Sequence, residues 1–201
     1  MIDFFQVNDA EPYSYFKILY DEAYKSNQKN IEAINVSSYS KINSEVNSRI
    51  VNIKFVKGDK FYFFSNYESP KSIDFENHNQ VACIFYWHEI DAQIRIKGMI
   101  EKISERESDE HFKKRNLSKN ILAISSNQSK KIKSYENVLE KYNETFNKYK
   151  KLDQIKRPSY WGGFCIRPYE FEFWRGHESR INKREHFIYE DNLWIKSFLE
   201  P

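Results

Sequence analysis

Three arginines and a tryptophan gather near the C-terminus in the segment FEFWRGHESRINKR, from Phe171 to Arg184. Trp174 ends an alternating apolar run, and Arg175 and Arg180 follow it in the same segment. Guanidinium groups bind carboxylates and phosphates through paired hydrogen bonds, and an indole offers a flat apolar surface to a ring. The segment is therefore a candidate binding site for an anion or an aromatic ring at the end of a strand.

Cations, hydroxyl groups and side-chain amides recur at other expected strand ends and helix faces. These groups are Arg49 with Lys54, Ser65 with Ser69 and Lys71, Gln93 with Arg95, and Gln128 with Ser129. Arginine forks and hydroxyls hold phosphates, and amides suit the edge of a polar heterocycle. Taken singly, each group also fits ordinary exposed polar residues on a strand surface.

A further basic group lies in DEHFKKRNLSK. His111 and Arg115 are four residues apart and share a helix face, with Lys119 one turn further on if the helix continues. The face is a candidate anion site, although a single histidine on a charged helix is more often only solvated. The five histidines show no HxxxH or HxH spacing and no serine stands in a nucleophile elbow, so we expect neither a metal site nor hydrolytic chemistry.

The composition is that of a folded chain with little net charge. Of its 201 residues, 40% are hydrophobic and 17% are aromatic, far more than a disordered chain contains. The 32 basic and 29 acidic residues leave a net charge of +3, so the total gives no reason to expect a nucleic-acid partner. No linker divides the sequence, and we expect one domain over residues 1–201.

Two features bear on the compartment in which the protein works. No apolar run reaches the roughly 20 residues that span a bilayer, and the first residues lack a basic segment followed by an apolar core. We therefore expect a cytoplasmic protein with no membrane segment. Cys83 and Cys165 stand far apart among strand-like apolar neighbours without CxxC spacing, so we expect two buried and inert thiols.

Helical periodicity marks the elements that flank these polar groups. Apolar residues recur at three- and four-residue intervals after Pro12, which predicts an N-terminal helix over about residues 12–28. Further helices are expected in SPKSIDFENHN, in SERESDEHFKKRN and in KKIKSYENVLEKYNETFNKYKKL. In the second of these, Ser104 and Glu107 have the spacing of a capping box.

Strands account for most of the remaining chain. They are expected in IEAINVSS, SRIVNIKFV, FYFFSN, QVACIFYW, DAQIRIKGMIEKI, FCIRPYEFEFW, EHFIYE and LWIKSFL. Residues 92–98 alternate between an apolar face and a mostly polar face that could line a site, and Asp191 and Asn192 form a turn pair between the last two strands. Hairpins with inserted helices and no βαβ rhythm favour an antiparallel barrel, α+β in class.

Separated motifs of the chain resemble those of the pyridoxamine 5'-phosphate oxidase family in order and approximate spacing. They are RIVNIK, FYFFSNYESPKS, FYWHEIDAQIRIKG, ESDEHFKKR, NQS, PSYWGGFCIRPYEFEFW and RINKR. The resemblance covers nearly the whole chain and implies an FMN-binding antiparallel split β-barrel with peripheral helices. It also implies a homodimer with two flavins in clefts between the subunits.

The resemblance implies cofactor contacts residue by residue. The residues implied to contact FMN are Arg49, Lys54, Phe64, Ser65, Lys71, Gln93, Gln128, Ser129, Trp174 and Arg184. Arg49, Lys71 and Ser65 would hold the phosphate, while the two glutamines and Ser129 would face the flavin or its ribityl chain. Trp174 and Arg184 would close the site from the second subunit.

The resemblance also implies substrate contacts. The residues implied to bind a phosphorylated pyridine are Lys54, His111, Arg115, Lys119 and Arg180. Arg115 would touch the phosphate and Arg180 would lie over the ring. Arg180 and Asn182 are the implied catalytic residues.

Several positions depart from the family pattern. The C-terminal signature normally reads Arg, aliphatic, His, acidic or Asn, Arg, whereas this chain has Arg180, Ile181, Asn182, Lys183 and Arg184. Arg175 stands where Gln, His or Gly is usual. At the substrate phosphate His111 replaces a tyrosine and Lys119 a serine, and Pro70 replaces an FMN-phosphate arginine. A flavin-side tyrosine is Phe64 in this chain.

The activity implied is FMN-dependent oxidation of pyridoxamine or pyridoxine 5'-phosphate to pyridoxal 5'-phosphate, with oxygen as the acceptor. An alternative, motivated by Asn182, His111 and Lys119, is a family member that acts on a different ring substrate such as a phenazine-type compound. A second alternative is a non-catalytic binder of FMN or pyridoxal phosphate. A single-strand nucleic-acid barrel with stacking aromatics fits the composition but not the order of the motifs.

Overall fold

The computed structural model describes residues 1–152 and 155–201, and the chain folds into two compact units. The first unit comprises Met1–Phe63, Asp74–Glu101 and Cys165–Pro201. The second unit comprises Phe64–Ile73 and Lys102–Phe164. No helix in the described part of the chain has the length and apolar character needed to cross a membrane.

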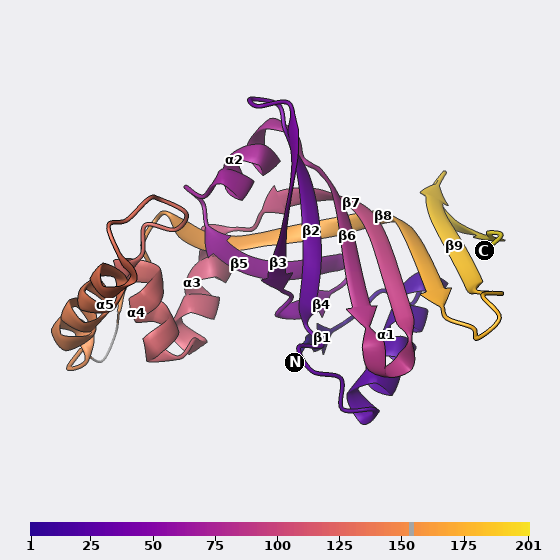
Figure 1. Cartoon of the computed structure of the whole chain (residues 1–201), viewed down its shortest axis with the longest axis horizontal. Helices are drawn as coiled ribbons and strands as arrows, with labels where there is room; N and C mark the ends of the chain where they lie inside the picture. Colours follow the sequence, from indigo (N-terminus) through magenta and orange to yellow (C-terminus); the bar gives the residue numbers. More distant parts are fainter. Residues whose placement is uncertain (153–154) are drawn as a thin grey trace. The chain divides into compact units, whose positions relative to one another are not determined.

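Ten strands of the described residues form one mixed sheet (Figure 1). They are β1 (Asp3–Phe5), β2 (Ala33–Ser40), β3 (Glu45–Asn52), β4 (Phe55–Lys57), β5 (Lys60–Asn66), β6 (Gln80–Trp87), β7 (Ala92–Lys102), β8 (Trp161–Arg175), β9 (Lys183–Glu190) and β10 (Leu193–Phe198). The strand order is β1-β4-β5-β8-β7-β6-β2-β3, and β9 pairs with both β8 and β10. Neighbours such as β2–β3, β6–β7 and β9–β10 are antiparallel, whereas β1 joins β4 in parallel.

Helices interrupt the strand sequence at the four expected places, and Leu117–Ser125 and His88–Ile90 add two helical segments that were not predicted. The helices are α1 (Glu11–Lys25), α2 (Pro70–Asn77), α3 (Glu105–Lys114), α4 (Leu117–Ser125) and α5 (Tyr135–Tyr149), and a short 3-10 helix, η1, covers His88–Ile90. In the second unit α4 and α5 pack against each other (Figure 1). The largely antiparallel sheet with separate helices confirms the predicted α+β class.

Helix α1 buries the predicted face but ends earlier than predicted. Phe16, nearly fully buried, lies with its ring 5.0 Å from that of Phe61 and 5.7 Å from that of Trp87. The helix was expected to run to about residue 28, but Asn27 adopts a left-handed conformation with φ 58°. The Gln28 N–H then donates to the Ala23 carbonyl, which terminates the helix by a capping geometry that asparagine tolerates better than most residues.

Two short-range signals of the sequence are confirmed in detail. Ser104 caps α3, and its hydroxyl oxygen accepts a hydrogen bond from the Glu107 N–H at 3.2 Å. Asp191 and Asn192 both have positive φ, 48° and 66°, as a two-residue hairpin turn of the mirror-image type requires. Both signals depend only on neighbours in the chain.

Both cysteines are buried, as predicted. Cys83 is 1% exposed and Cys165 is 2% exposed. Burial raises the pKa of the Cys83 thiol strongly. Burial, aided by the negative charge of Glu101 and opposed by the positive charge of Lys60, raises the pKa of Cys165 to about 12. A protonated thiol is a poor nucleophile, so neither cysteine is suited to covalent catalysis.

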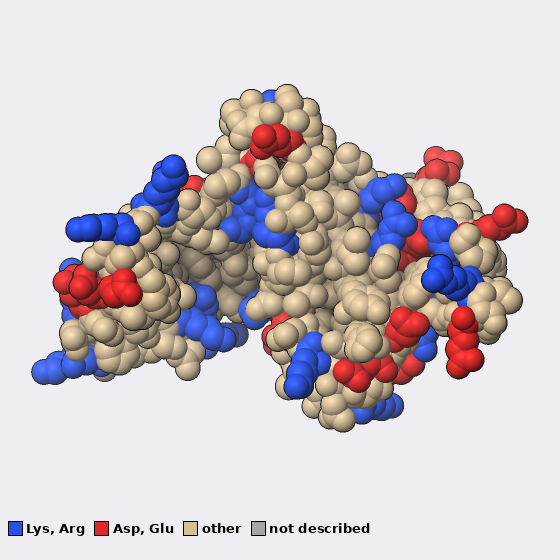
Figure 2. Space-filling view, in the orientation of Figure 1, with Lys and Arg blue, Asp and Glu red and all other residues tan. Residues whose placement is uncertain are grey.

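Charged side chains of both signs meet around β9 and β10 (Figure 2). Lys196 of β10 pairs with Glu185 at 3.0 Å and also with Glu11 of α1, and Lys183 pairs with Glu185 at 2.8 Å. Tyr15 also hydrogen-bonds to Glu185, which is 6% exposed. These contacts tie α1 to the C-terminal hairpin within the first unit.

We expect Gly162→Ala to destabilise the protein by about 1–3 kcal/mol, the usual range for overpacking a core. A Cβ at position 162 would lie 2.2 Å from the Tyr67 hydroxyl oxygen and 2.9 Å from Ser108 Oγ. Urea denaturation measures the change. Adding Tyr67→Phe removes the nearest clashing atom and should recover part of the loss, whereas an unchanged midpoint in the single variant would contradict the packing argument.

Candidate functional site

The predicted site residues divide between the two units. The first unit holds Arg49, Lys54, Gln93, Trp174, Arg180, Asn182 and Arg184. The second unit holds Phe64, Ser65, Lys71, His111, Arg115, Lys119, Gln128 and Ser129.

Arg49 of β3 reaches the neighbouring strand β2. Its Nη1 donates to Ser38 Oγ at 2.8 Å and to the Val36 carbonyl at 3.2 Å. The nearest carboxylate, on Asp74, is 3.7 Å from Nη2, a distance too long for a strong hydrogen bond. Burial lowers the pKa of Arg49 and the charge of Asp74 opposes that effect. The guanidinium is therefore a partly desolvated cation fixed mainly by neutral groups.

Arg184 of β9 is held by a buried carboxylate on β8. Glu172, 5% exposed, accepts from Arg184 Nε at 2.8 Å and from Arg95 Nη1 at 2.8 Å. Arg184 Nη1 also donates to the Glu200 carbonyl at 2.7 Å, and the hydrogen bond that Arg184 donates to Glu172 raises the pKa of Arg184. Trp174 is the residue directly opposite Arg184 in the β8–β9 register, so the two predicted residues lie on the same face of neighbouring strands.

Gln93 and Arg95 lie on the predicted polar face of β7. Residues of β7 alternate between buried and more exposed positions, with Ala92, Ile94 and Ile96 buried. Arg95 uses this face to bind a glutamate of β8, whereas Gln93 stands opposite Tyr86 of β6.

We expect Glu172→Gln to destabilise the fold by about 1–3 kcal/mol, because it leaves two arginines without their shared counter-charge. Glu170 is the matched control, since it lies two residues earlier on β8, is 21% exposed in its side chain and pairs with Lys97 at 2.9 Å. Glu170→Gln should change the free energy of unfolding by less than about 1 kcal/mol. Denaturant unfolding compares the two variants, and equal losses would contradict a special role for Glu172.

The loop between β8 and β9 carries Arg180 and Asn182. Arg180 has φ 60°, its N–H donates to the His177 carbonyl at 2.8 Å, and its side chain is exposed. The Asn182 side-chain oxygen accepts from the His177 N–H at 3.1 Å. Asn182 therefore closes the loop that presents Arg180.

Arg175, the remaining arginine of the C-terminal segment, binds a helix. Its guanidinium forms a two-point contact with Glu22 of α1, at 2.7 Å and 3.2 Å. This pair joins β8 to α1 inside the first unit. The sequence offered no signal for it, because the two residues are 153 positions apart.

Lys54 links β3 to β4 by its main chain. Its N–H donates to the Tyr62 carbonyl at 2.8 Å, and its carbonyl accepts from the Asp3 N–H at 3.0 Å. Its ammonium charge is one of the groups that lower the pKa of Glu32, whose burial acts in the opposite direction. The side chain is half-buried.

In the second unit, three predicted residues, Ser65, Lys71 and Gln128, lie at or near the end of β5. Asn66 is 5% exposed, and its N–H donates to Gln128 Oε1 at 3.4 Å. The Asn66 carbonyl accepts from Ser69 Oγ at 2.8 Å, and Ser69 Oγ in turn accepts from Lys71 Nζ at 3.0 Å. Ser65, one residue before, is 7% exposed, and Lys71 is 8% exposed. The strand end is thus a polar, buried position supplied with a cation, hydroxyls and an amide.

Pro70 begins α2, immediately after this strand end. Proline suits the first helical position, because its missing N–H would have no partner within the helix there. The fold therefore accepts the proline at this position.

The helix that carries His111 ends within the predicted segment and does not continue to Lys119. Helix α3 ends at Lys114, and Arg115 adopts an extended conformation with ψ 147°. Asn116 then caps α4, since its side chain accepts from the Ser118 N–H. Lys119 thus lies on a second helix, because an asparagine cap restarts helix formation there. Its carbonyl nevertheless accepts from Arg115 Nη1 at 2.9 Å.

Aromatic rings stack beside Arg115. The His111 ring lies 3.6 Å from the Phe64 ring at an interplanar angle of 6°, and Phe64 lies 5.4 Å from Trp161 at 14°. Arg115 Cζ lies 4.6 Å from the centroid of the Trp161 ring. The predicted residues Phe64, His111 and Arg115 are therefore brought together, and Trp161 is a member of the group that sequence reasoning missed. The PSYWGG motif contained it, but spacing gave it no partner.

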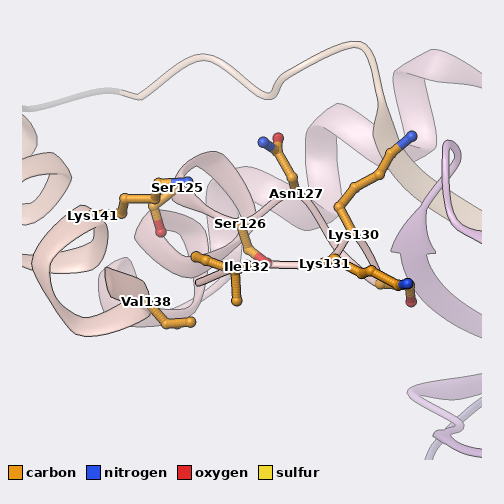
Figure 3. Close-up of a pocket in the computed structure, with 9 residues that line it drawn as sticks. Ser125, Ser126, Asn127, Lys130, Lys131, Ile132, Val138 and Lys141 are labelled. Carbon is orange, nitrogen blue, oxygen red and sulfur yellow. The ribbon is translucent and has the colours of Figure 1, made fainter. Parts of the chain in front are cut away.

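Ser129 lines a cavity of about 230 Å³ at the junction of α4 and α5. The lining residues are Ser125, Ser126, Asn127, Ser129, Lys130, Lys131, Ile132, Val138 and Lys141. Figure 3 shows Lys130 and Lys131 extending to one side and Lys141 lying on the other. The three ammonium groups point apart and give no single focus for an anion. Among the residues described by the structure, no group of three or more His, Cys, Asp or Glu side chains could hold a metal ion.

Two family models match this chain. The model described as pyridoxamine 5'-phosphate oxidase matches residues 20–147, and the model described as the pyridoxine 5'-phosphate oxidase C-terminal dimerisation region matches residues 161–201. Each unit contains residues that these models match.

Relatives of known name extend over nearly the whole chain. The pyridoxine/pyridoxamine 5'-phosphate oxidase of Polynucleobacter asymbioticus is 35% identical over 98% of this chain and 94% of the relative. The protein of the same name from Christiangramia forsetii is 34% identical over 95% of this chain and 89% of that relative.

Solved structures share the fold at lower identity. PhzG of Burkholderia lata, in complex with tetrahydrophenazine-1-carboxylic acid, has a TM-score of 0.89 and 21% identity over 96% of this chain and 93% of that one. A pyridoxamine 5'-phosphate oxidase-related, FMN-binding protein of Nostoc punctiforme has a TM-score of 0.78 and 11% identity over 96% of this chain and 99% of that one.

Proposed function

This chain belongs to the pyridoxamine 5'-phosphate oxidase family, and from that membership we propose that it is an FMN-dependent oxidase converting pyridoxamine or pyridoxine 5'-phosphate to pyridoxal 5'-phosphate, with oxygen as acceptor. The observation that carries the proposal is identity of 35% to a named oxidase over 98% of the chain. The retention of Lys54, Arg115 and Arg180 in the expected motifs supports it.

The residues present fit the phosphate of FMN. The Arg49 guanidinium donates to neutral oxygens, and its Nη2 is as far as 3.7 Å from the Asp74 carboxylate. The guanidinium therefore keeps the capacity to bind an anion. Lys71 is 8% exposed and its ammonium donates to a serine hydroxyl. A buried cation among hydroxyl groups suits a phosphate, because such a charge needs hydrogen-bonded partners. We therefore assign the phosphate to Arg49, Lys71 and Ser65.

The remaining cofactor contacts are assigned to the flavin and its ribityl chain. The residues assigned are Lys54, Phe64, Gln93, Gln128, Ser129, Trp174 and Arg184. When bound, FMN supplies the redox chemistry, taking up the electrons of the substrate carbon and passing them to oxygen. Arg184 is held by a buried glutamate and so offers a positive charge in a fixed orientation. Cations or hydrogen-bond donors beside the flavin favour its reduction by stabilising the negative charge that develops.

Substrate binding is assigned to Lys54, His111, Arg115, Lys119 and Arg180. Arg115 and Lys119 supply positive charge for the substrate phosphate, and the stacked His111 ring adds a hydrogen-bonding edge. Arg180, presented by its loop, orients the pyridine ring, and the Asn182 amide nitrogen donates a hydrogen bond to it. Orientation of the reacting carbon is the protein's main contribution to the rate.

We propose that the protein is a homodimer through its C-terminal region. Residues 161–201 match a dimerisation region, and within them Ile181, Leu193, Ile195 and Phe198 are large apolar side chains that are 53% to 69% exposed. Exposed apolar groups of this kind are typical of an interface. In this arrangement Trp174 and Arg184 of one copy complete the flavin site of the other.

Turnover of purified, FMN-loaded protein tests the proposal. Pyridoxamine 5'-phosphate and pyridoxine 5'-phosphate are supplied in turn, and formation of the aldehyde is followed by absorbance. Anaerobic addition of either substrate should bleach the flavin, and air should restore its colour. Flavin that stays oxidised with both compounds would reject the proposed activity.

A second candidate function has support from the same residues. Asn182, His111 and Lys119 replace the residues usual at the substrate side, and PhzG, which shares the fold, is known in complex with a tetrahydrophenazine. A family member that oxidises a different ring compound would bleach with that compound and not with the pyridoxine phosphates. A protein that retains FMN or pyridoxal phosphate tightly, and bleaches with no candidate substrate, would instead be a non-catalytic binder.

A further inference from the structure

Arg115 is a partly buried cation without a counter-charge among residues 1–152 and 155–201. Its polar contacts are neutral, because Nη1 donates to the Lys119 carbonyl at 2.9 Å and to Asn120 Oδ1 at 3.4 Å. Burial lowers its pKa, and no charged group opposes that effect. The guanidinium therefore keeps its charge and most of its donors available to a ligand.

The flat face of this guanidinium lies against the indole of Trp161. The distance from Arg115 Cζ to the ring centroid is 4.6 Å, within the range of a cation–π contact. An indole attracts the cation without neutralising it, whereas a carboxylate would compete with an anionic ligand for the same donors. The contact also restricts the rotamers of a long side chain, so less entropy is lost when a phosphate binds.

Trp161 is itself fixed on several sides. Its side chain is 5% exposed and packs against Phe112 at 5.3 Å, edge to face, and against Phe64. Arg157 holds its main chain, since Nη1 donates to the Trp161 carbonyl at 2.6 Å while Nε binds Asp109 of α3 at 2.6 Å. The indole is therefore a rigid support attached to the helix that precedes Arg115.

We propose that Trp161 is a positioning residue that gives this protein its preference for the phosphorylated form of its substrate, by holding Arg115 in an orientation competent to bind the phosphate. The proposal rests on the proposed function, because it takes Arg115 as the phosphate-binding residue. It adds Trp161 and its anchor Arg157 to the site.

The test uses FMN-loaded protein and compares ligands with and without the phosphate. Dissociation constants for pyridoxal 5'-phosphate and pyridoxal are measured by absorbance titration, and kcat and KM are measured with pyridoxamine 5'-phosphate. Trp161→Leu should weaken pyridoxal 5'-phosphate binding and raise KM by about tenfold, with pyridoxal binding and kcat changed by less than about twofold. Trp161→Phe should give a smaller loss, because a benzene ring is a weaker cation partner.

Tyr160→Phe is the matched control. Tyr160 precedes Trp161 and its hydroxyl donates to the Ile124 carbonyl at 3.0 Å. The variant disturbs the same turn without removing the indole, and it should leave the preference for the phosphorylated ligand unchanged. A loss as large as that of Trp161→Leu would overturn the proposal.

A double-mutant cycle with Arg115→Gln separates positioning from general damage to the fold. If Trp161 acts through Arg115, Trp161→Leu should cause no further loss of phosphate preference in the Arg115→Gln background. Additive losses, or equal weakening of pyridoxal and pyridoxal 5'-phosphate, would overturn the proposal. If Trp161→Leu does not fold by circular dichroism, the cycle is run with Trp161→Phe.

The wild-type result distinguishes this inference from the proposed function. If the wild-type protein does not prefer the phosphorylated ligand, both the proposed function and the role of Trp161 are contradicted. If the wild-type protein prefers the phosphorylated ligand and the Trp161 variants keep that preference, only the role of Trp161 is contradicted.

Discussion

Arg180→Ala should lower kcat/KM for pyridoxamine 5'-phosphate by about 100-fold or more while the affinity for FMN changes by less than about threefold. Loss of one group that stabilises the transition state reduces rates by about 10²–10³. Arg180 is exposed, and its loop is held by main-chain contacts and by the Asn182 side chain. Truncation of its side chain therefore removes a functional group and leaves the loop in place.

The backbone conformation at position 180 does not contribute to the difference expected between Arg180→Ala and the wild-type protein. Arg180 has φ 60°, a conformation that alanine and arginine tolerate about equally, since both carry a Cβ. Ser179→Ala is a suitable control, because the Ser179 contact with His177 Nδ1 uses only its main-chain N–H. Stopped-flow measurement of anaerobic flavin bleaching reports the chemical step, and FMN titration reports retention. An Arg180→Ala protein that bleaches at the wild-type rate would rule out this role.

Arg49→Ala should have the opposite profile, with FMN binding weakened by about 10- to 150-fold. A charge-assisted hydrogen bond contributes about 1.5–3 kcal/mol, and each 1.4 kcal/mol corresponds to a factor of ten in affinity. Because Pro70 already stands at one of the phosphate-binding positions of the family pattern, the remaining cations carry more of the binding. At saturating FMN, turnover should recover to near the wild-type value.

Two controls sharpen the Arg49 experiment. Arg49→Lys keeps the charge but loses the planar fork, so an intermediate affinity is expected. Arg167→Ala removes a surface arginine of β8 that is 57% exposed in its side chain and pairs with Asp59, and it should not affect FMN. Fluorescence quenching during FMN titration measures all three variants. Tight FMN binding by Arg49→Ala together with lost turnover would contradict the assignment of Arg49 to the FMN phosphate.

Features that depend on near neighbours in the chain were predictable before the fold was known. The buried face of α1, the Ser104 cap and the Asp191–Asn192 turn all agree with the predictions, because helical periodicity, capping and turn geometry are set by residues a few positions apart. The ordered motifs extended this local information to the family and to the α+β class.

Predictions of where a helix ends were less accurate than predictions of which residues it buries. The sequence was consistent with a helix running from His111 through Lys119, but Asn116 can either continue a helix or cap a new one. Its side chain accepts from the Ser118 N–H and so favours the second outcome. The same competition ends α1 at Lys25, where Asn27 takes the left-handed conformation.

Only the tertiary structure decided which distant side chains meet. Arg175 pairs with Glu22, Glu172 joins two arginines, and Trp161 supports Arg115, although residues in these contacts stand from 12 to 153 positions apart. Ionic and cation–π contacts have no sequence period, because they form wherever strand register and helix packing bring the side chains together. The residue types were therefore enough to predict the chemistry of the candidate site. The contacts that hold each cation in place could be identified only in the folded structure.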